Sequence, residues 1–281
     1  MREIQAKTLC AKVKELFLQA NYRIGPDILS ALHTASEKEH SPTGRAVLQQ
    51  LIENDQIAAN EKIAICQDTG ISVLFIHLGQ DVHLTNGNFN EAIQQGVKEA
   101  YQEGYLRKSI VTDPVFDRNN TGDNTPAVIH VDIVPGNQIE IEVSPKGFGS
   151  ENMSALKMLT PADGEKGVRN FIMETVQKAG PNPCPPIVVG VGIGSTIEMA
   201  AKIAKKATMR KVGSRNFDPR YAKMEMELLQ NINKLGIGPA GLGGNTTALA
   251  VNIEWLPAHI ASLPVVVNIC CHAARHAKGV I

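Results

Sequence analysis

The chain has 281 residues, 43% of them hydrophobic and 4% aromatic, which is enough to bury a large aliphatic core as one domain or as two closely joined lobes. Lys and Arg together number 28, as do Asp and Glu, so no net charge field favours nucleic acid or an anionic membrane surface as a partner. No apolar run approaches the roughly 18 residues of a transmembrane helix, and we expect a soluble protein.

The first part of the chain is predominantly helical. Helical patterns cover residues 2–20, 26–38 and 43–58. The first pattern mixes acidic and basic residues with an apolar stripe, which is typical of a folded amphipathic helix and not of a targeting segment. Residues 71–78 then form an apolar run typical of a buried strand, directly after the turn that contains Cys66. Residues 88–104 are helical, and the polar, Asn-rich residues 107–125 predict a long functional loop.

The second part mixes strands and helices. Residues 128–134 and 139–143 alternate apolar and polar side chains, and their connection predicts a hairpin with one wet face. That face is expected to carry His130, Asp132, Glu140 and Glu142. Further helices are expected over 165–179, 196–208 and 219–235, and strands over 187–193, 247–254 and 263–270. The predicted fold class is α/β (mixed α+β), with N-terminal helices followed by a mixed sheet, flanking helices and glycine-rich loops, in a single domain over residues 1–281 or two intimate lobes.

Three glycine-rich stretches adjoin regular elements. In residues 190–196 an apolar strand runs into a helix N-terminus, where backbone N–H groups favour an anion. A nucleotide-dependent α/β enzyme is one alternative, but the spacing is G-x-G-x-G, and Lys211 and Arg215 stand where a ribose-binding acid is expected. A carboxylate-binding or cluster-supporting loop and a purely structural turn also remain open. Residues 146–152 and 241–246 can likewise bring backbone close to a small ligand.

Three of the five cysteines stand far apart, each in a setting that a packing cysteine does not need. Cys66 lies in the run ICQDTG, Cys184 in NPCPP and Cys271 in CHAAR. Single cysteines on Pro/Gly turns are one way to hold an iron–sulfur cluster by three thiolates and leave one iron open to substrate. A cysteine taken alone is more often a buried structural residue than a ligand. The odd count and irregular spacing favour a reduced intracellular protein over disulfides, and no paired spacing typical of zinc occurs.

Taken together, these motifs resemble the class I, iron–sulfur fumarate hydratases. The resemblance is to their α subunit, which shares its plan with the α subunit of L-tartrate dehydratase. It extends over nearly the whole chain, and the motifs occur in the same order as in the family. The matching segments are residues 65–70, 146–152, 182–186, 190–196, 236–239, 241–246 and 271–275.

The resemblance implies a cofactor and a set of site residues. In the family a [4Fe-4S] cluster is held by three cysteines, which match Cys66, Cys184 and Cys271, and Cys270 is then not a ligand. The family's substrate-binding positions fall on Gln67, Asp68, Arg107 and Gly149. A family histidine that reaches the active site of the neighbouring subunit falls on His259, so Asp68 and His259 are the candidate catalytic residues.

Chemistry supports this division of roles. Removal of hydroxide next to carboxylates needs a Lewis acid, which an open iron supplies. Charge-assisted contacts, each contributing roughly 1.5 to 3 kcal/mol, suit Arg107 and the Gln67 amide as binders of a dicarboxylate. Asp68 is expected to hydrogen-bond the substrate hydroxyl. No residue of the chain is a convincing base for the proton on carbon.

In the family the missing base lies on a second domain or a separate β subunit. This chain ends ten residues after Cys271, so the resemblance implies the α subunit of a cytoplasmic two-subunit hydro-lyase, assembled as a dimer of αβ pairs. The expected substrate is a small dicarboxylate, with no nucleic-acid or membrane partner. A non-catalytic iron–sulfur redox or sensor protein is the alternative from another class, and the response of a single iron to substrate discriminates between the two.

The run KGFGSEN at residues 146–152 bears on the substrate. Fumarases of this class carry the same pattern, whereas tartrate dehydratases depart from it with a glycine run that ends in cysteine. We therefore expect interconversion of fumarate and L-malate, with L-tartrate dehydration as the alternative within the family.

Overall fold

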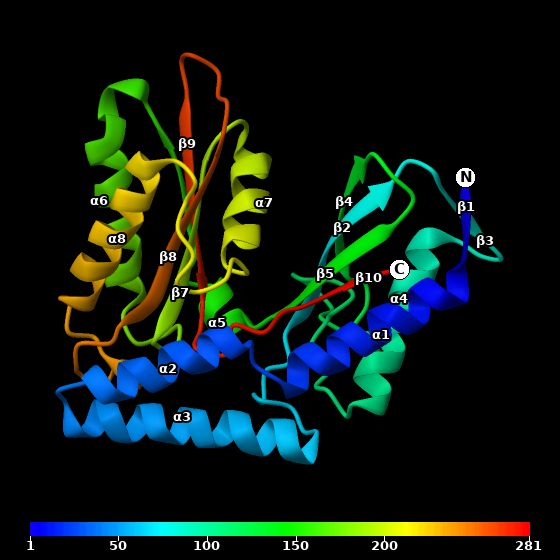
Figure 1. The fold of residues 1–281 in the computed structure, drawn as a ribbon, viewed down its shortest axis with the longest axis horizontal. Coiled ribbons are helices and arrows are strands. Elements are labelled where there is room, and N and C mark those ends of the chain that lie inside the picture. Colours follow the sequence, from blue (N-terminus) through cyan, green and yellow to red (C-terminus); the bar gives the residue numbers. More distant parts are fainter. The chain divides into compact units, whose positions relative to one another are not determined.

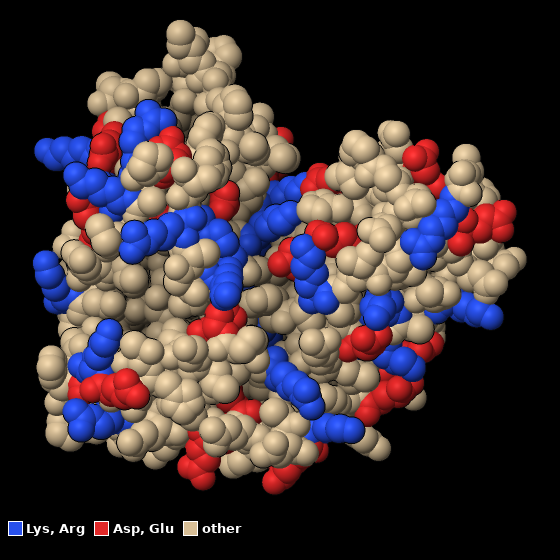
Figure 2. Space-filling model, in the orientation of Figure 1, with Lys and Arg blue, Asp and Glu red and all other residues tan.

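The computed structural model describes all residues from 1 to 281, and they group into two compact units. Unit 1 comprises Met1–Gly25, Asp55–Phe148 and Arg275–Ile281, and unit 2 comprises Pro26–Asn54 and Gly149–Ala274. Both units combine helices with sheet strands (Figure 1), which confirms the predicted mixed α/β class. Acidic and basic side chains lie close to one another at many places on the face drawn in Figure 2. No helix combines the length and the apolar composition that crossing a bilayer requires.

Unit 1 is built on a four-stranded sheet. Its elements are β1 (Arg2–Gln5), α1 (Ala6–Tyr22), β2 (Ile71–Gly79), β3 (Val82–Thr85), α4 (Phe89–Glu103), β4 (Val128–Val134), β5 (Ile139–Lys146) and β10 (Ala277–Val280). The strand order is β10-β5-β2-β4, and β1 and β3 form a separate parallel pair. Apolar side chains of α1 and α4 pack against those of β2 and β5 and form the core of this unit. The region between α4 and β4 contains no helix or strand, as predicted for residues 107–125.

The structure corrects two predictions in unit 1. Residues 2–5 form a strand and not the start of a helix, because Ile4 is buried where β1 pairs with β3, a contact that the local pattern does not reveal. Strands β4 and β5 do not form the predicted hairpin, since β2 lies between them in the sheet. The shared polar face is nevertheless present, because the register places His77 of β2 directly between Asp132 and Glu140.

Unit 2 is a sheet with helices on both faces. Its elements are α2 (Pro26–Lys38), β6 (Ala155–Leu159), the 3₁₀ turns Pro161–Asp163 and Pro239–Gly241, α6 (Gly164–Ala179), β7 (Ile187–Gly194), α7 (Ile197–Ala207), α8 (Pro219–Asn233), β8 (Ala248–Leu256) and β9 (Leu263–Cys270). Two of the four boundaries between the units fall inside α3 (Pro42–Glu61) and α5 (Phe148–Glu151), and the other two lie just before α2 and between β9 and β10. The strand order is β6-β9-β7-β8, with α7 on one face and α6 and α8 on the other (Figure 1). The short helix α5 lies in what the sequence predicted as a glycine-rich loop.

Glycines in β7 allow helix α7 to pack directly on the sheet. A Cβ atom at Gly190 would lie 2.2 Å from the carbonyl oxygen of Ala204, and one at Gly192 would lie 2.0 Å from that of Ala200. Such distances are far inside van der Waals contact, so these two positions require glycine. Close helix packing therefore accounts for part of the G-x-G-x-G pattern without a nucleotide.

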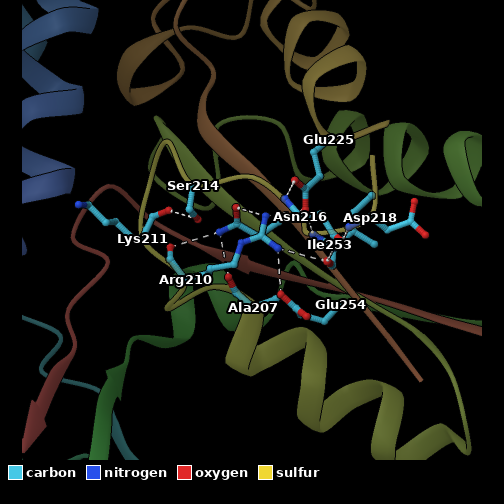
Figure 3. Close-up of polar contacts among 10 residues, drawn as sticks. Ala207, Arg210, Lys211, Ser214, Asn216, Asp218, Glu225, Ile253 and Glu254 are labelled. Carbon is cyan, nitrogen blue, oxygen red and sulfur yellow. Dashed lines mark hydrogen bonds and ion pairs between the residues drawn. The ribbon is translucent and has the colours of Figure 1, made fainter. Parts of the chain in front are cut away.

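Strand β8 lies at the edge of the unit 2 sheet, and side chains cover its outer backbone groups (Figure 3). Arg210 donates to the carboxylates of Glu225 and Glu254, at 2.5 and 2.9 Å. The second contact of Glu225 is with the N–H of Ile253, at 2.7 Å, while the Asn216 amide donates to the Ile253 carbonyl, also at 2.7 Å. The backbone of Ile253 is thus satisfied by side chains, which closes this edge to pairing with another strand.

We expect Glu225→Ala to lower the free energy of unfolding by about 3 kcal/mol, because it leaves the largely buried guanidinium of Arg210 without its main partner. Chemical denaturation of the full chain measures this. Glu227→Ala is the matched control, since Glu227 forms more exposed ion pairs with Arg169 and Lys223 and its loss should cost less than about 1 kcal/mol. Equal effects of the two variants on the free energy of unfolding would contradict a structural role for the contact between Glu225 and Arg210.

Candidate functional site

The turn at residues 65–70 of unit 1 carries three of the predicted site residues: Cys66, Gln67 and Asp68. It leads into β2, and its first amide, that of Ile65, donates to the Asn21 carbonyl at 2.9 Å. Gly70 closes the turn with φ at 78°, and a Cβ atom there would lie 2.5 Å from the backbone of Lys146. Only glycine fits this position, because a side chain would be both strained and in collision with β5.

The carboxylate of Asp68 ties this turn to the end of β5. One oxygen accepts from the N–H of Gly70 at 2.9 Å, and the other accepts from the N–H of Phe148 at 2.8 Å. A Cβ atom at Gly147 would lie 3.2 Å from the same carboxylate, so the glycine lets the two segments approach. Asp68 therefore organises the backbone on which Gln67 lies, and each of its oxygens retains a second lone pair for a further donor.

A buried arginine holds the same turn from the other side. Arg275 is only 2% exposed, and it donates to the carbonyl of Asp68 at 2.7 Å and to the side-chain oxygen of Asn21 at 3.2 Å. Since Asn21 also accepts from Ile65, both ends of the Cys66 segment are anchored by one pair of residues. In the sequence, Arg275 lies four residues after Cys271.

The long loop that contains Arg107 is also joined to this turn. The hydroxyl of Thr69 donates to the carbonyl of Arg107 at 3.0 Å, and the side chain of Asn124 donates to the carbonyl of Gly70 at 3.1 Å. The hydroxyl of Tyr101 lies within hydrogen-bonding distance of the carbonyls of Thr69 and Gly70, and burial raises the pKa of Tyr101 to about 12, so it remains a donor. Unit 1 thus brings Gln67, Asp68 and the backbone of Arg107 together.

Cys184 and Cys271 lie on turns of unit 2. Cys184 is exposed, has φ at 55°, and its N–H donates to the carbonyl of Pro181 at 3.1 Å. Cys271 is the first residue after β9 and is partly exposed. The N–H of His272 lies 3.4 Å from the carbonyl of Cys184, which brings the two turns side by side.

The other two cysteines have different surroundings, and none of the five forms a disulfide. Cys10 lies on α1, where burial together with the charge of Glu99 raises the pKa of its thiol. Cys270 is buried in β9, with 7% of its surface exposed. Cys66, Cys184 and Cys271 thus lie on turns, whereas Cys10 lies in a helix and Cys270 in a strand.

The remaining predicted residues belong to unit 2. Gly149 lies in α5, and a Cβ atom there would meet nothing closer than the carbonyl of Asn182, at 3.8 Å. His259 lies on the exposed tip between β8 and β9, where its hydrogen bonds connect it with Ala261 and Ser262. Within each unit, no group of three or more His, Cys, Asp or Glu side chains has the arrangement of a metal site.

Sequence reasoning did not identify four residues that position the Cys66 turn. These are Asn21, Tyr101, Asn124 and Arg275. Arg275 stands in the run CHAAR, which the sequence did single out, but nothing in that run indicates a contact with Asp68. Asn21, Tyr101 and Asn124 lie in ordinary helix or loop patterns, and only the fold brings them to the turn.

Comparison with known proteins gives consistent matches over almost the whole chain. The family model described as fumarate hydratase (Fumerase) matches residues 10–280. A protein of Methanocaldococcus jannaschii, named "Putative L(+)-tartrate dehydratase subunit alpha", is 46% identical over 270 residues, which is 94% of each chain. The L(+)-tartrate dehydratase subunit alpha of Escherichia coli (strain UTI89) is 36% identical over 257 residues, 90% of this chain and 84% of that protein.

We expect Arg275→Met to loosen the Cys66 turn. The Asp68 carbonyl and Asn21 lose a charged donor, so the amides of Ile65 and Gly70 should exchange with solvent roughly tenfold faster or more. Hydrogen exchange of the full chain, with Arg23→Met as an exposed control in the same unit, measures this. An equal acceleration throughout β2 would instead indicate that the variant merely destabilises the unit as a whole.

Proposed function

The chain belongs to the fumarate hydratase (Fumerase) family, and from this premise we propose that it is the α subunit of a two-subunit hydro-lyase. Its relatives in Methanocaldococcus jannaschii and Escherichia coli carry names that include "subunit alpha", which supports a separate β partner. In the proposal both units form one catalytic domain, and the active assembly is a cytoplasmic dimer of αβ pairs.

The cofactor in this proposal is a [4Fe-4S] cluster held by Cys66, Cys184 and Cys271. The donor set fits, because all three thiols are at least partly exposed on anchored turns and can act as soft thiolate ligands. When bound, such a cluster supplies a Lewis acid at an iron that the protein does not ligate, which assists the departure of hydroxide. Cys10 and Cys270 fill space in packed elements and have no part in the site.

The chain's own polar groups are proposed to hold the substrate. Gln67 is exposed on the anchored turn and can donate its amide to a carboxylate, and Arg107 is exposed at the start of the adjoining loop. Gly149, in the short helix α5, offers a backbone N–H. Asp68 keeps the turn in shape and can accept from the substrate hydroxyl through its remaining lone pairs.

Proton transfer at carbon is assigned mainly to the partner. Asp68, on the Cys66 turn, already accepts two backbone hydrogen bonds, so it is not assigned as the base for the proton on carbon. His259, on its exposed tip, is proposed to act at the site of a neighbouring α subunit, as its family counterpart does. The β subunit then contributes the residue that exchanges the proton.

Fumarate is the proposed substrate, and the run KGFGSEN at residues 146–152 is the observation that carries this choice. It has the pattern of fumarases, whereas tartrate dehydratases differ there. L-Tartrate is the second candidate, favoured by the names of the two relatives. The additional hydroxyl of tartrate needs a partner of its own, and leaving it unpaired costs roughly 1 to 3 kcal/mol, which separates the two substrates by about 5- to 150-fold.

Anaerobic co-purification of the chain with its β subunit tests the proposal. The complex is expected to interconvert fumarate and L-malate with a kcat/KM at least about tenfold above that for L-tartrate, while the isolated chain has no measurable turnover. Arg107→Ala should lower kcat/KM for both substrates, and Arg118→Ala, in the same exposed loop, should leave it near the wild-type value. A preference for tartrate would contradict the assignment of fumarate as the substrate. Turnover by the isolated chain would contradict the assignment of the proton-exchanging residue to the β subunit.

A further inference from the structure

Glu39 is a fully buried carboxylate for which the proposed chemistry has no use. It lies between α2 and α3 and has no exposed surface. It accepts hydrogen bonds from the backbone N–H of Ser41 at 3.0 Å and from that of Asn245 at 3.0 and 3.1 Å. Burial alone would raise the pKa of Glu39, but these bonds and those from Thr246 outweigh burial and hold the pKa below its ordinary value.

The partner of Glu39 is the glycine-rich segment at residues 236–246. Gly244 has φ at 130°, and a Cβ atom there would lie 2.7 Å from a carboxylate oxygen of Glu39. This position therefore requires glycine so that the backbone can reach the carboxylate. The contact is reciprocal, because the Asn245 side chain accepts from the N–H of His40 at 2.9 Å and donates to the carbonyl of Lys38 at 3.3 Å.

The same segment reaches the turn that carries Cys184. The N–H of Ala240 donates to the carbonyl of Pro185 at 2.8 Å. A Cβ atom at Gly241 would lie 2.2 Å from the Cβ of Pro181, so the segment also lies against the other end of the turn. Cys184 is thus flanked on both sides by residues that the glycine-rich segment contacts.

Internal contacts connect the part of the segment that binds Glu39 with the part that binds the Cys184 turn. The N–H of Gly243 donates to the carbonyl of Ile237 at 2.9 Å, and a Cβ atom at Gly238 would lie 2.1 Å from the Gly243 carbonyl oxygen. The two arms of the segment therefore lie against each other, with one arm on Glu39 and the other on Pro185. All of these contacts lie within unit 2.

We propose that Glu39 is a positioning residue for Cys184, acting through the glycine-rich segment at residues 236–246. It neither touches the substrate nor binds the metal. Its carboxylate fixes the segment, and the segment holds the Cys184 turn, with its positive φ, in the conformation that presents the thiolate. The role in cluster binding rests on the proposed function, whereas the mechanical link between Glu39 and Cys184 does not.

Glu39→Gln tests the link in the full chain without iron. The amide is uncharged and offers one acceptor oxygen in place of two for the donors of Ser41, Asn245 and Thr246, so the hold on the segment weakens. The N–H groups of Asn245, Ala240 and Cys184 should therefore exchange roughly tenfold faster or more. Amides in the centre of β7 should change much less. Glu37→Gln, with the same change of charge at an exposed position of α2, should exchange like the wild type. Glu39→Asp keeps the charge but shortens the reach, and it should give a smaller increase that stays measurable if Glu39→Gln does not fold.

A faster Asn245 amide with unchanged Ala240 and Cys184 amides would overturn the proposal, because the segment would then move without the turn. Uniform acceleration across unit 2 would overturn it as well, since it indicates general destabilisation.

Iron content after anaerobic reconstitution separates the link between Glu39 and Cys184 from the role of that link in cluster binding. Glu39→Gln should hold at most about a third of the iron of the wild type, because a looser Cys184 turn has to be ordered when the metal binds. If the wild-type chain binds no iron while the exchange pattern is as expected, the proposed function fails and the link remains.

Discussion

Both parts of the candidate site depend on one kind of interaction, the hydrogen bond from a backbone N–H group to a buried or half-buried carboxylate. In unit 1, Asp68 accepts from Gly70 and Phe148 and so fixes the turn that carries Cys66 and Gln67. In unit 2, Glu39 accepts from Ser41 and Asn245 and so fixes the segment next to the Cys184 turn. Each bond is charge-assisted and satisfies a backbone donor that an irregular turn would otherwise leave unpaired. Gly244 follows from the same constraint, because only glycine lets the backbone there approach the Glu39 carboxylate.

Such anchoring explains how a thiol can be accessible and yet fixed in place. A ligand on a mobile loop would have to be ordered when metal binds, and the lost conformational entropy would weaken binding. Cys184 is exposed, but its turn is bonded to Ala240 through the Pro185 carbonyl and packs against Gly241 through Pro181. The Cys66 turn is held in unit 1 by Asn21 and Arg275. In the proposed enzyme the α subunit therefore presents preformed ligands and carboxylate-binding groups, while proton exchange at carbon is left to the β subunit.

Much of this fold follows from local pattern, and the exceptions have physical causes. Helices such as α2 and α6 and strands such as β2 and β7 were predictable because their apolar spacing is strong. The short strands β1, β3, β6 and β10 were not, since they depend on pairing with distant segments, and the same is true of the insertion of β2 between β4 and β5. At the site, the motifs identified the turns and the cysteines on them. The roles of Asn21, Glu39 and Arg275 were hidden, because a buried polar or charged side chain reveals its function only through its partners.

The central claim is that the three cysteines on anchored turns, and not the two in packed elements, hold one iron–sulfur cluster. Its most direct test is the iron and sulfide content of the anaerobically reconstituted chain with each cysteine replaced in turn by serine, since a hydroxyl is a poor substitute for a soft thiolate. Cys66→Ser, Cys184→Ser and Cys271→Ser should each lose the cluster and its brown colour, whereas Cys10→Ser and Cys270→Ser should keep both. Retention of a full cluster by Cys271→Ser together with its loss in Cys270→Ser would contradict the account.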